Sequence, residues 1–67
     1  MEKVKKNRKK HGYSYSKMAE LLGISKPYYW QLENGKRNLS YSMAFKIAKL
    51  FKLKPDDLFY EEYKSKN

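Results

Sequence analysis

Apolar residues recur along the chain at helical spacing, and glycine, serine and proline residues divide this pattern into five segments. The clearest stripe consists of Ala44, Ile47, Ala48 and Phe51, which fall at positions i, i+3, i+4 and i+7 of one helical face. No segment sustains the alternation of apolar and polar residues that is typical of a half-buried strand. The pattern therefore predicts an all-α fold.

The ends of the helices follow from residues that favour them. A serine before the first turn can accept a hydrogen bond from a free amide, and proline is tolerated within that turn. A glycine just past the last turn adopts the left-handed conformation cheaply. We expect helices from near Glu2 to Gly12, over 15–22 between Ser14 and Gly23, from Ser25 to Asn34-Gly35 with Pro27 in the first turn, over about 41–52 after Ser40, and from Pro55 onward.

These helices are expected to form one domain, residues 1–63, followed by a polar tail, residues 64–67. A chain of 67 residues buries only about 60% of its extended surface, which leaves little room for a catalytic cavity. It has no cysteine and a single histidine, so a disulfide framework is excluded and a metal site is not expected. Its apolar runs are far shorter than a membrane span or signal peptide requires, so we expect a soluble, cytoplasmic protein.

Positive charge is concentrated in most of the chain. The sequence has 16 basic and 7 acidic residues, a formal net charge of +9. Residues 1–54 have 14 basic and 3 acidic side chains (+11), whereas residues 55–67 have 2 and 4 (−2). Such a field attracts a polyanion such as DNA, although charge alone does not distinguish this from an ordinary solvated surface.

Residues 15–34, YSKMAELLGISKPYYWQLEN, have the spacing of a helix-turn-helix. A small residue, Ala19, allows the second helix of the pair to approach closely, and Gly23 provides a sharp left-handed turn. Each of these features alone is weak evidence for the motif, but all of them occur at the spacing that a helix-turn-helix requires. Numbered from Tyr15, the motif has apolar or small residues at positions 4, 5, 8, 9, 10, 15 and 18: Met18, Ala19, Leu22, Gly23, Ile24, Tyr29 and Leu32.

The stretch from residue 12 to 40, and more loosely 4 to 59, resembles the Cro/C1-type helix-turn-helix family, also called the Xre family. The resemblance implies a compact five-helix, lambda-repressor-like domain that binds operator DNA, commonly as a homodimer. Three residues depart from the family pattern: Tyr15 replaces a usual glutamine, Asn7 a usual apolar residue, and Leu39 a usual proline. The matching pieces are Gly12-Tyr13-Ser14, Met18-Ala19, Leu22-Gly23-Ile24-Ser25, Leu32-Glu33-Asn34-Gly35-Lys36-Arg37, Lys46-Ile47-Ala48-Lys49 and Asp57-Leu58-Phe59.

The resemblance also implies that the N-terminal part of the third helix enters the major groove of DNA. On a helical wheel Tyr29 and Leu32 point inward, so the opposite side is free to contact bases. Trp30 lies off the inward side, and could pack against a neighbouring element or follow the groove wall. Lysine suits guanine, glutamine suits adenine, and an aromatic edge suits the thymine methyl group. The candidate base-contacting residues are Lys26, Pro27, Tyr28 and Gln31.

Phosphate contacts are expected at the start of the second helix and in the loop after the third. A helix N-terminus favours an anion, and a tyrosine hydroxyl can donate to phosphate. Lys9 and Lys10 are expected only to add to the positive field. The candidate phosphate-binding residues are Ser14, Tyr15, Lys36, Arg37 and Asn38.

One charge in the first helix is expected to be structural. Met1, Val4, Arg8 and His11 form a single stripe, so Arg8 should face inward, where an unpaired cation is costly. Glu33, on the flank of the third helix, is the candidate partner, and the resemblance points to the same pair. We expect a partly buried ion pair that orients the third helix, and for His11 a surface or packing role.

These observations favour a sequence-specific regulator of transcription, a repressor or autoregulator that binds double-stranded DNA at the nucleoid as a homodimer on a palindromic operator. We expect no catalytic residues, no metal and no cofactor, because the acids are scattered and the serines cap helices. The main alternative is an antitoxin-like or bridging module that binds an unidentified protein, with Phe59, Tyr60 and Tyr63 supplying the surface. Binding of RNA through stacked tyrosines is a third possibility.

Overall fold

The computed structural model describes residues 1–65, with side chains as far as Tyr60. This part of the chain contains helices and no strand, so the predicted all-α, five-helix fold is confirmed. Lys64 and Ser65, which we assigned to the polar tail, end the fifth helix, and residues 66–67 lie outside the described residues. The helices are α1 (Glu2–Lys10), α2 (Tyr15–Leu22), α3 (Lys26–Glu33), α4 (Tyr41–Leu50) and α5 (Pro55–Ser65).

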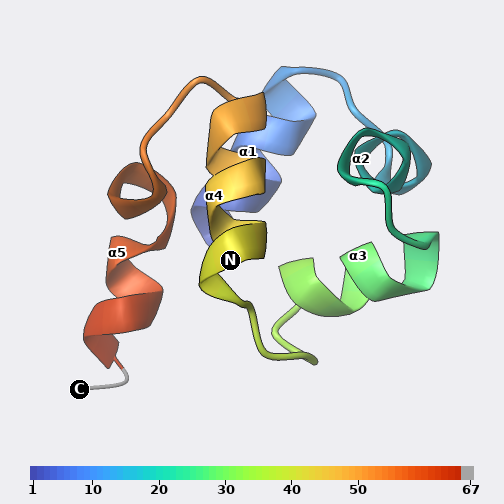
Figure 1. The fold of residues 1–67 in the computed structure, drawn as a ribbon. Coiled ribbons are helices and arrows are strands. Elements are labelled where there is room, and N and C mark those ends of the chain that lie inside the picture. The colour runs from blue at the N-terminus through green and yellow to red at the C-terminus, as the bar shows by residue number, and fades with distance from the viewer. Residues whose placement is uncertain (66–67) are drawn as a thin grey trace.

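The helices surround one hydrophobic core. Figure 1 shows α5 on one side of α4 and the α2–α3 pair on the other, with α1 behind. Within this arrangement α2 packs against α3, and α4 against α5. The stripe predicted on α4 is buried, as are the inward positions of α2 and α3. Each large side chain removed from water contributes roughly 1.5–3 kcal/mol. The core cluster contains Val4, Met18, Ala19, Leu22, Tyr29, Ala44, Ile47, Ala48, Phe51, Leu58 and Phe59.

The starts of α2, α3, α4 and α5 are fixed by hydrogen bonds to side chains. Ser14, Ser25 and Ser40 each accept a hydrogen bond from the backbone amide three residues later, at 3.0, 3.2 and 3.1 Å. These are the caps that the sequence predicts, and each satisfies an amide that has no partner within the helix. At the start of α5 the Asp57 carboxylate accepts from the Lys54 amide at 2.9 Å.

Four helices end in the same left-handed turn. Gly12, Gly23, Gly35 and Lys52 have φ of 71°, 71°, 70° and 58°. The amide after each of them donates to a carbonyl five residues earlier, at distances between 2.8 and 3.0 Å. This pairing is the Schellman motif, in which glycine is favoured because it lacks a Cβ atom. Lys52 adopts the same conformation although it has a Cβ atom. Because this turn ends the helix, α4 stops at Leu50, two residues earlier than expected.

Two departures from the family pattern are accommodated locally. The Asn7 amide nitrogen donates to the Lys3 carbonyl at 2.8 Å, so this partly buried polar side chain is satisfied within α1. Leu39 is partly buried against the core, where it contributes apolar contacts just before α4. Neither substitution changes the number or order of the helices.

Candidate nucleic-acid interface

The α2–α3 pair has the geometry of a helix-turn-helix. α2 ends at Leu22, Gly23 takes the left-handed conformation, and α3 begins at Lys26. The Ile24 amide donates to the Ala19 carbonyl at 3.0 Å, which closes the turn on the last turn of α2. Ala19 is buried, and its small side chain allows α3 to approach α2 closely.

The predicted base-contacting residues lie on the side of α3 that is turned away from the core. Lys26 and Pro27 are exposed, and Tyr28 and Gln31 are partly exposed. Trp30 is also exposed rather than packed into the core. The inward residues of the same helix, Tyr29 and Leu32, are fully buried. The side of α3 that the outward residues share is therefore open to a ligand.

The loop after α3 folds back toward that helix. Lys36, Arg37 and Asn38 are all exposed. The Lys36 amide donates to the Gln31 carbonyl at 2.8 Å, which reverses the chain at Gly35. The guanidinium carbon of Arg37 then lies over the Tyr28 ring, 4.7 Å from its centroid. A predicted phosphate contact and a predicted base contact are thus neighbours, which the sequence did not indicate.

Arg8 of α1 and Glu33 of α3 form a buried ion pair. Only 7% of Arg8 and 3% of Glu33 is exposed. Arg8 Nε donates to Glu33 Oε1 at 2.7 Å and Arg8 Nη2 to Glu33 Oε2 at 3.2 Å, a two-pronged geometry that strengthens the pair. Arg8 Nη1 donates to the Tyr13 carbonyl at 3.0 Å, and the Tyr29 hydroxyl donates to Glu33 Oε1 at 2.9 Å. Together these contacts link α1 to α3.

The surroundings of the pair shift two pKa values in ways that keep the network intact. The hydrogen bonds that Arg8 donates to the Glu33 carboxylate raise the pKa of the Arg8 guanidinium above its ordinary value, so Arg8 stays charged. Burial raises the pKa of the Tyr29 hydroxyl well above its ordinary value, and the negative charge of Glu33 raises it further. The hydroxyl is therefore held as a neutral donor to Glu33.

Tyr15 belongs partly to this internal network. Its ring lies 4.3 Å from the guanidinium carbon of Arg8 and 6.1 Å, centroid to centroid, from the Tyr29 ring. We assigned Tyr15 to the phosphate-binding set because it starts α2, and its packing on Arg8 was missed. Two features of the sequence could have indicated this packing. Tyr15 is aromatic where the family has glutamine, and Arg8 is predicted to face the interior.

His11 has a packing role at the end of α1. Its ring centroid lies 5.1 Å from that of Phe51 and 5.5 Å from that of Tyr13. His11 Nδ1 lies 2.9 Å from the Asn7 carbonyl oxygen. Among the side chains that the structure describes, those of residues 1–60, there is no group of three or more histidine, cysteine or acidic residues suited to hold a metal ion. None of the helices within residues 1–65 is long and apolar enough to cross a membrane.

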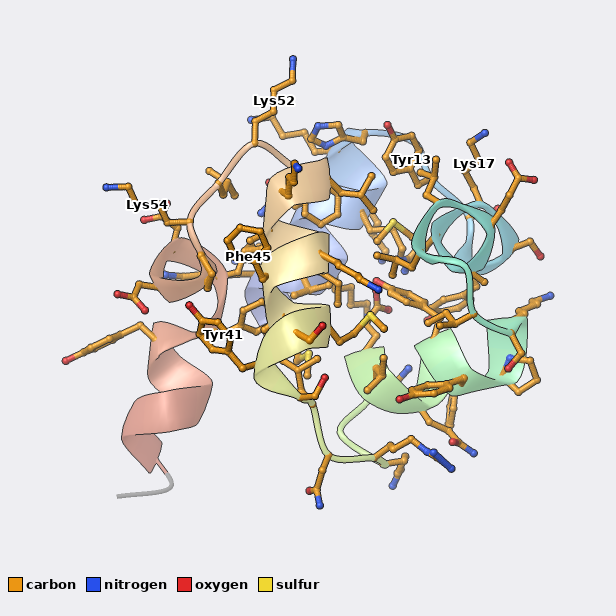
Figure 2. The ribbon with its side chains drawn as sticks, viewed as in Figure 1. Tyr13, Lys17, Tyr41, Phe45, Lys52 and Lys54 are labelled. Atoms are coloured by element: carbon orange, nitrogen blue, oxygen red, sulfur yellow. The ribbon has the colours of Figure 1, made fainter. Side chains whose placement is uncertain are left out.

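The structure also changes the aromatic surface proposed for a protein partner. Phe59 is fully buried, so it was wrong to include it in an exposed surface, and the Tyr63 side chain lies outside the described ones. Instead, Tyr41 and Phe45 are 72% and 50% exposed. Both project from α4 on the side turned toward α5 (Figure 2). We call these two residues the aromatic face of α4.

Comparison with known proteins agrees with this geometry. A family model described as helix-turn-helix matches residues 4–58. The chain is 37% identical over 60 residues to YgzD of Bacillus subtilis, which covers 90% of this chain and 91% of the relative. It is 38% identical over 60 residues to MJ0272 of Methanocaldococcus jannaschii, with the same coverage. Both relatives are named as uncharacterized HTH-type transcriptional regulators. No solved structure matches the chain. The match over most of its length shows that the chain belongs to the Cro/C1-type helix-turn-helix family of DNA-binding transcriptional regulators.

Proposed function

We propose that this protein recognises a specific double-stranded DNA sequence by inserting the N-terminal half of α3 into the major groove, and that it acts as a repressor or autoregulator. The observation that carries the proposal is the two-sided character of α3. Its inner side is fixed by the core and by Glu33, whereas its outer side presents Lys26 and Gln31 to solvent. A rigid helix with polar residues on its free side is suited to reading base edges.

The proposed contacts divide between bases and backbone. Lys26 would donate to guanine acceptors, Gln31 would pair with adenine, and Tyr28 and Pro27 would touch a thymine methyl group. The backbone would be held from two positions that flank α3. These are the start of α2, with Ser14 and the Tyr15 hydroxyl, and the following loop, with Lys36 and Asn38. Binding to chromosomal operators would bring the protein to the nucleoid.

Selection of bound duplexes from a random pool, followed by sequencing, tests this proposal. We expect a defined sequence, with Lys26→Ala and Gln31→Ala each losing preference at one base position, by about 1–3 kcal/mol. Lys9→Ala is the matched control for Lys26→Ala, because it removes the same charge from an exposed site on α1. Affinity should fall with salt at a slope of about −0.9 per phosphate contacted. A pool with no enriched sequence would contradict specific recognition and would favour a protein-binding role.

We further propose that the protein binds a palindromic operator as a homodimer whose copies meet at the aromatic face of α4. Large apolar side chains that stay exposed often mark interaction sites, and this face lies on the opposite side of α4 from α2 and α3. Contact there would leave both α3 helices free.

Sedimentation equilibrium of the free protein tests the dimer. Phe45→Glu should shift it toward monomer, whereas Ser42→Glu, which adds the same charge at another exposed position of α4, should not. A selected sequence without two-fold symmetry, bound by one copy, would contradict the dimer and leave specific recognition standing.

A further inference from the structure

The loop arginine Arg37 is held against the outer side of α3. The left-handed turn at Gly35 reverses the chain, and the hydrogen bond from the Lys36 amide to the Gln31 carbonyl, 2.8 Å long, fixes that reversal. As a result the guanidinium carbon of Arg37 lies over the ring of Tyr28, 4.7 Å from its centroid. Tyr28 is in the first turn of α3, the part proposed to enter the major groove.

The donors of Arg37 are unused in the part of the chain that the structure describes. No hydrogen bond or ion pair engages its guanidinium there, and the residue is exposed. Its contact with Tyr28 involves the aromatic face and leaves the N–H groups free. The side chain is therefore restrained while its hydrogen-bonding capacity is available to a ligand.

A second arginine in the same molecule shows how such a group is otherwise satisfied. Arg8 also lies over a tyrosine ring, that of Tyr15, at 4.3 Å. Its donors, however, are engaged by both carboxylate oxygens of Glu33 and by the Tyr13 carbonyl. The arrangement at Arg37 repeats the stacking on tyrosine but lacks the pair of acceptors that completes it at Arg8.

We propose that the missing acceptors are the O6 and N7 atoms of a guanine, so that Arg37 determines specificity and is not a general phosphate contact. A planar, restrained guanidinium matches these two atoms, and arginine with guanine is the commonest specific contact in the major groove. Because Tyr28 lies in the first turn of α3, it holds Arg37 over the side of that helix that would face the bases. This inference rests on the proposed DNA recognition, and it moves Arg37 out of the phosphate-binding set that the sequence predicted.

Substitution of Arg37 by lysine separates the two roles, because lysine keeps the charge but loses the fork. Binding of the full chain is measured to its selected duplex and to every single-base variant, at several salt concentrations. We expect Arg37→Lys to lose most of a preference of roughly 5- to 150-fold for guanine at one position. The preferences at other positions and the salt slope should stay unchanged. Tyr28→Leu should weaken the same guanine preference, and Tyr28→Phe, which keeps the ring, should retain it.

Lys36→Ala serves as the control for a phosphate contact. It should weaken binding to all variants alike and reduce the salt slope by about 0.9 for each bound copy. If Arg37→Lys leaves the whole base profile unchanged, or if Arg37→Ala weakens all variants alike, Arg37 is a phosphate contact and the inference is overturned. Absence of any base preference in the unmodified protein would instead overturn the proposed recognition itself, which makes the two failures distinguishable.

Discussion

Removal of either member of the Arg8–Glu33 pair should destabilise this protein far more than removal of both. The pair is almost fully buried, and the Glu33 carboxylate accepts three hydrogen bonds, two from Arg8 and one from the Tyr29 hydroxyl. In Glu33→Leu, the Arg8 guanidinium keeps only its bond to the Tyr13 carbonyl. In Arg8→Met, the Glu33 carboxylate keeps only the Tyr29 hydroxyl. Each single substitution leaves an uncompensated charge in the interior.

The expected magnitude is large relative to the stability of the whole domain. Breaking a buried pair by removing one partner costs about 3–5 kcal/mol. A domain of 67 residues has a free energy of unfolding of roughly 3–10 kcal/mol, taking about 0.05–0.15 kcal/mol per residue. Either single substitution should therefore remove a large part of the free energy of unfolding. The double variant replaces both charges by apolar groups of similar length and should lose much less, because no charge is left buried.

Urea unfolding followed by circular dichroism measures the three variants and the unmodified protein. The coupling energy is the loss in the double variant minus the losses in the two single variants, and we expect a magnitude of at least about 2 kcal/mol. If the single variants are too unstable for a baseline, a stabilising osmolyte added equally to all four proteins restores one. Equal losses, with the double variant at the sum of the singles, would refute the pairing as a source of stability.

Substitutions at three further residues test other features of the structure. The raised pKa of Tyr29 means that its contribution to stability is full below about pH 10 and is lost as the pH rises above that value. Tyr29→Phe should therefore flatten the alkaline decline of the unfolding free energy by up to about 1.4 kcal/mol per pH unit. Lys52→Gly should raise the unfolding free energy by about 1 kcal/mol, since glycine adopts φ of 58° without strain, and an unchanged urea midpoint would argue against strain there. Tyr15→Phe should keep the melting temperature but weaken binding to DNA, whereas Tyr15→Leu should lower both. An unaltered affinity in Tyr15→Phe would exclude a role for the hydroxyl.

The sequence predicted the helices and their boundaries well, because these depend on interactions between residues that are close in sequence. The serines that cap α2, α3 and α4, and the glycine at the end of α3, each act on backbone groups within a few residues. Amphipathic spacing likewise depends only on helix geometry. Lys52 escaped prediction because lysine has no preference of its own for the left-handed conformation that it adopts here, in a turn closed by the Leu53 amide donating to the Ala48 carbonyl at 2.9 Å.

Contacts between side chains distant in sequence were harder to predict. The position of Tyr15 at the start of α2 predicts a phosphate contact, yet its ring also packs on Arg8 of α1. Arg37 was assigned by its charge, yet the reversal at Gly35 sends it back to Tyr28. Both contacts pair an aromatic ring with a guanidinium, an interaction that has no fixed spacing along the chain.

In α3, the residues that fix the helix to the core are different from those that are exposed, and this has a consequence for the evolution of the domain. Glu33, Tyr29 and Leu32 fix the helix from inside, whereas Lys26 and Gln31 contribute nothing to the core. Exposed positions of this kind usually change stability by no more than about 0.5 kcal/mol when substituted. The residues proposed to choose the operator can therefore be exchanged almost independently of folding. Duplicated copies of such a gene could acquire new target sites through a few substitutions, without first requiring a more stable parent.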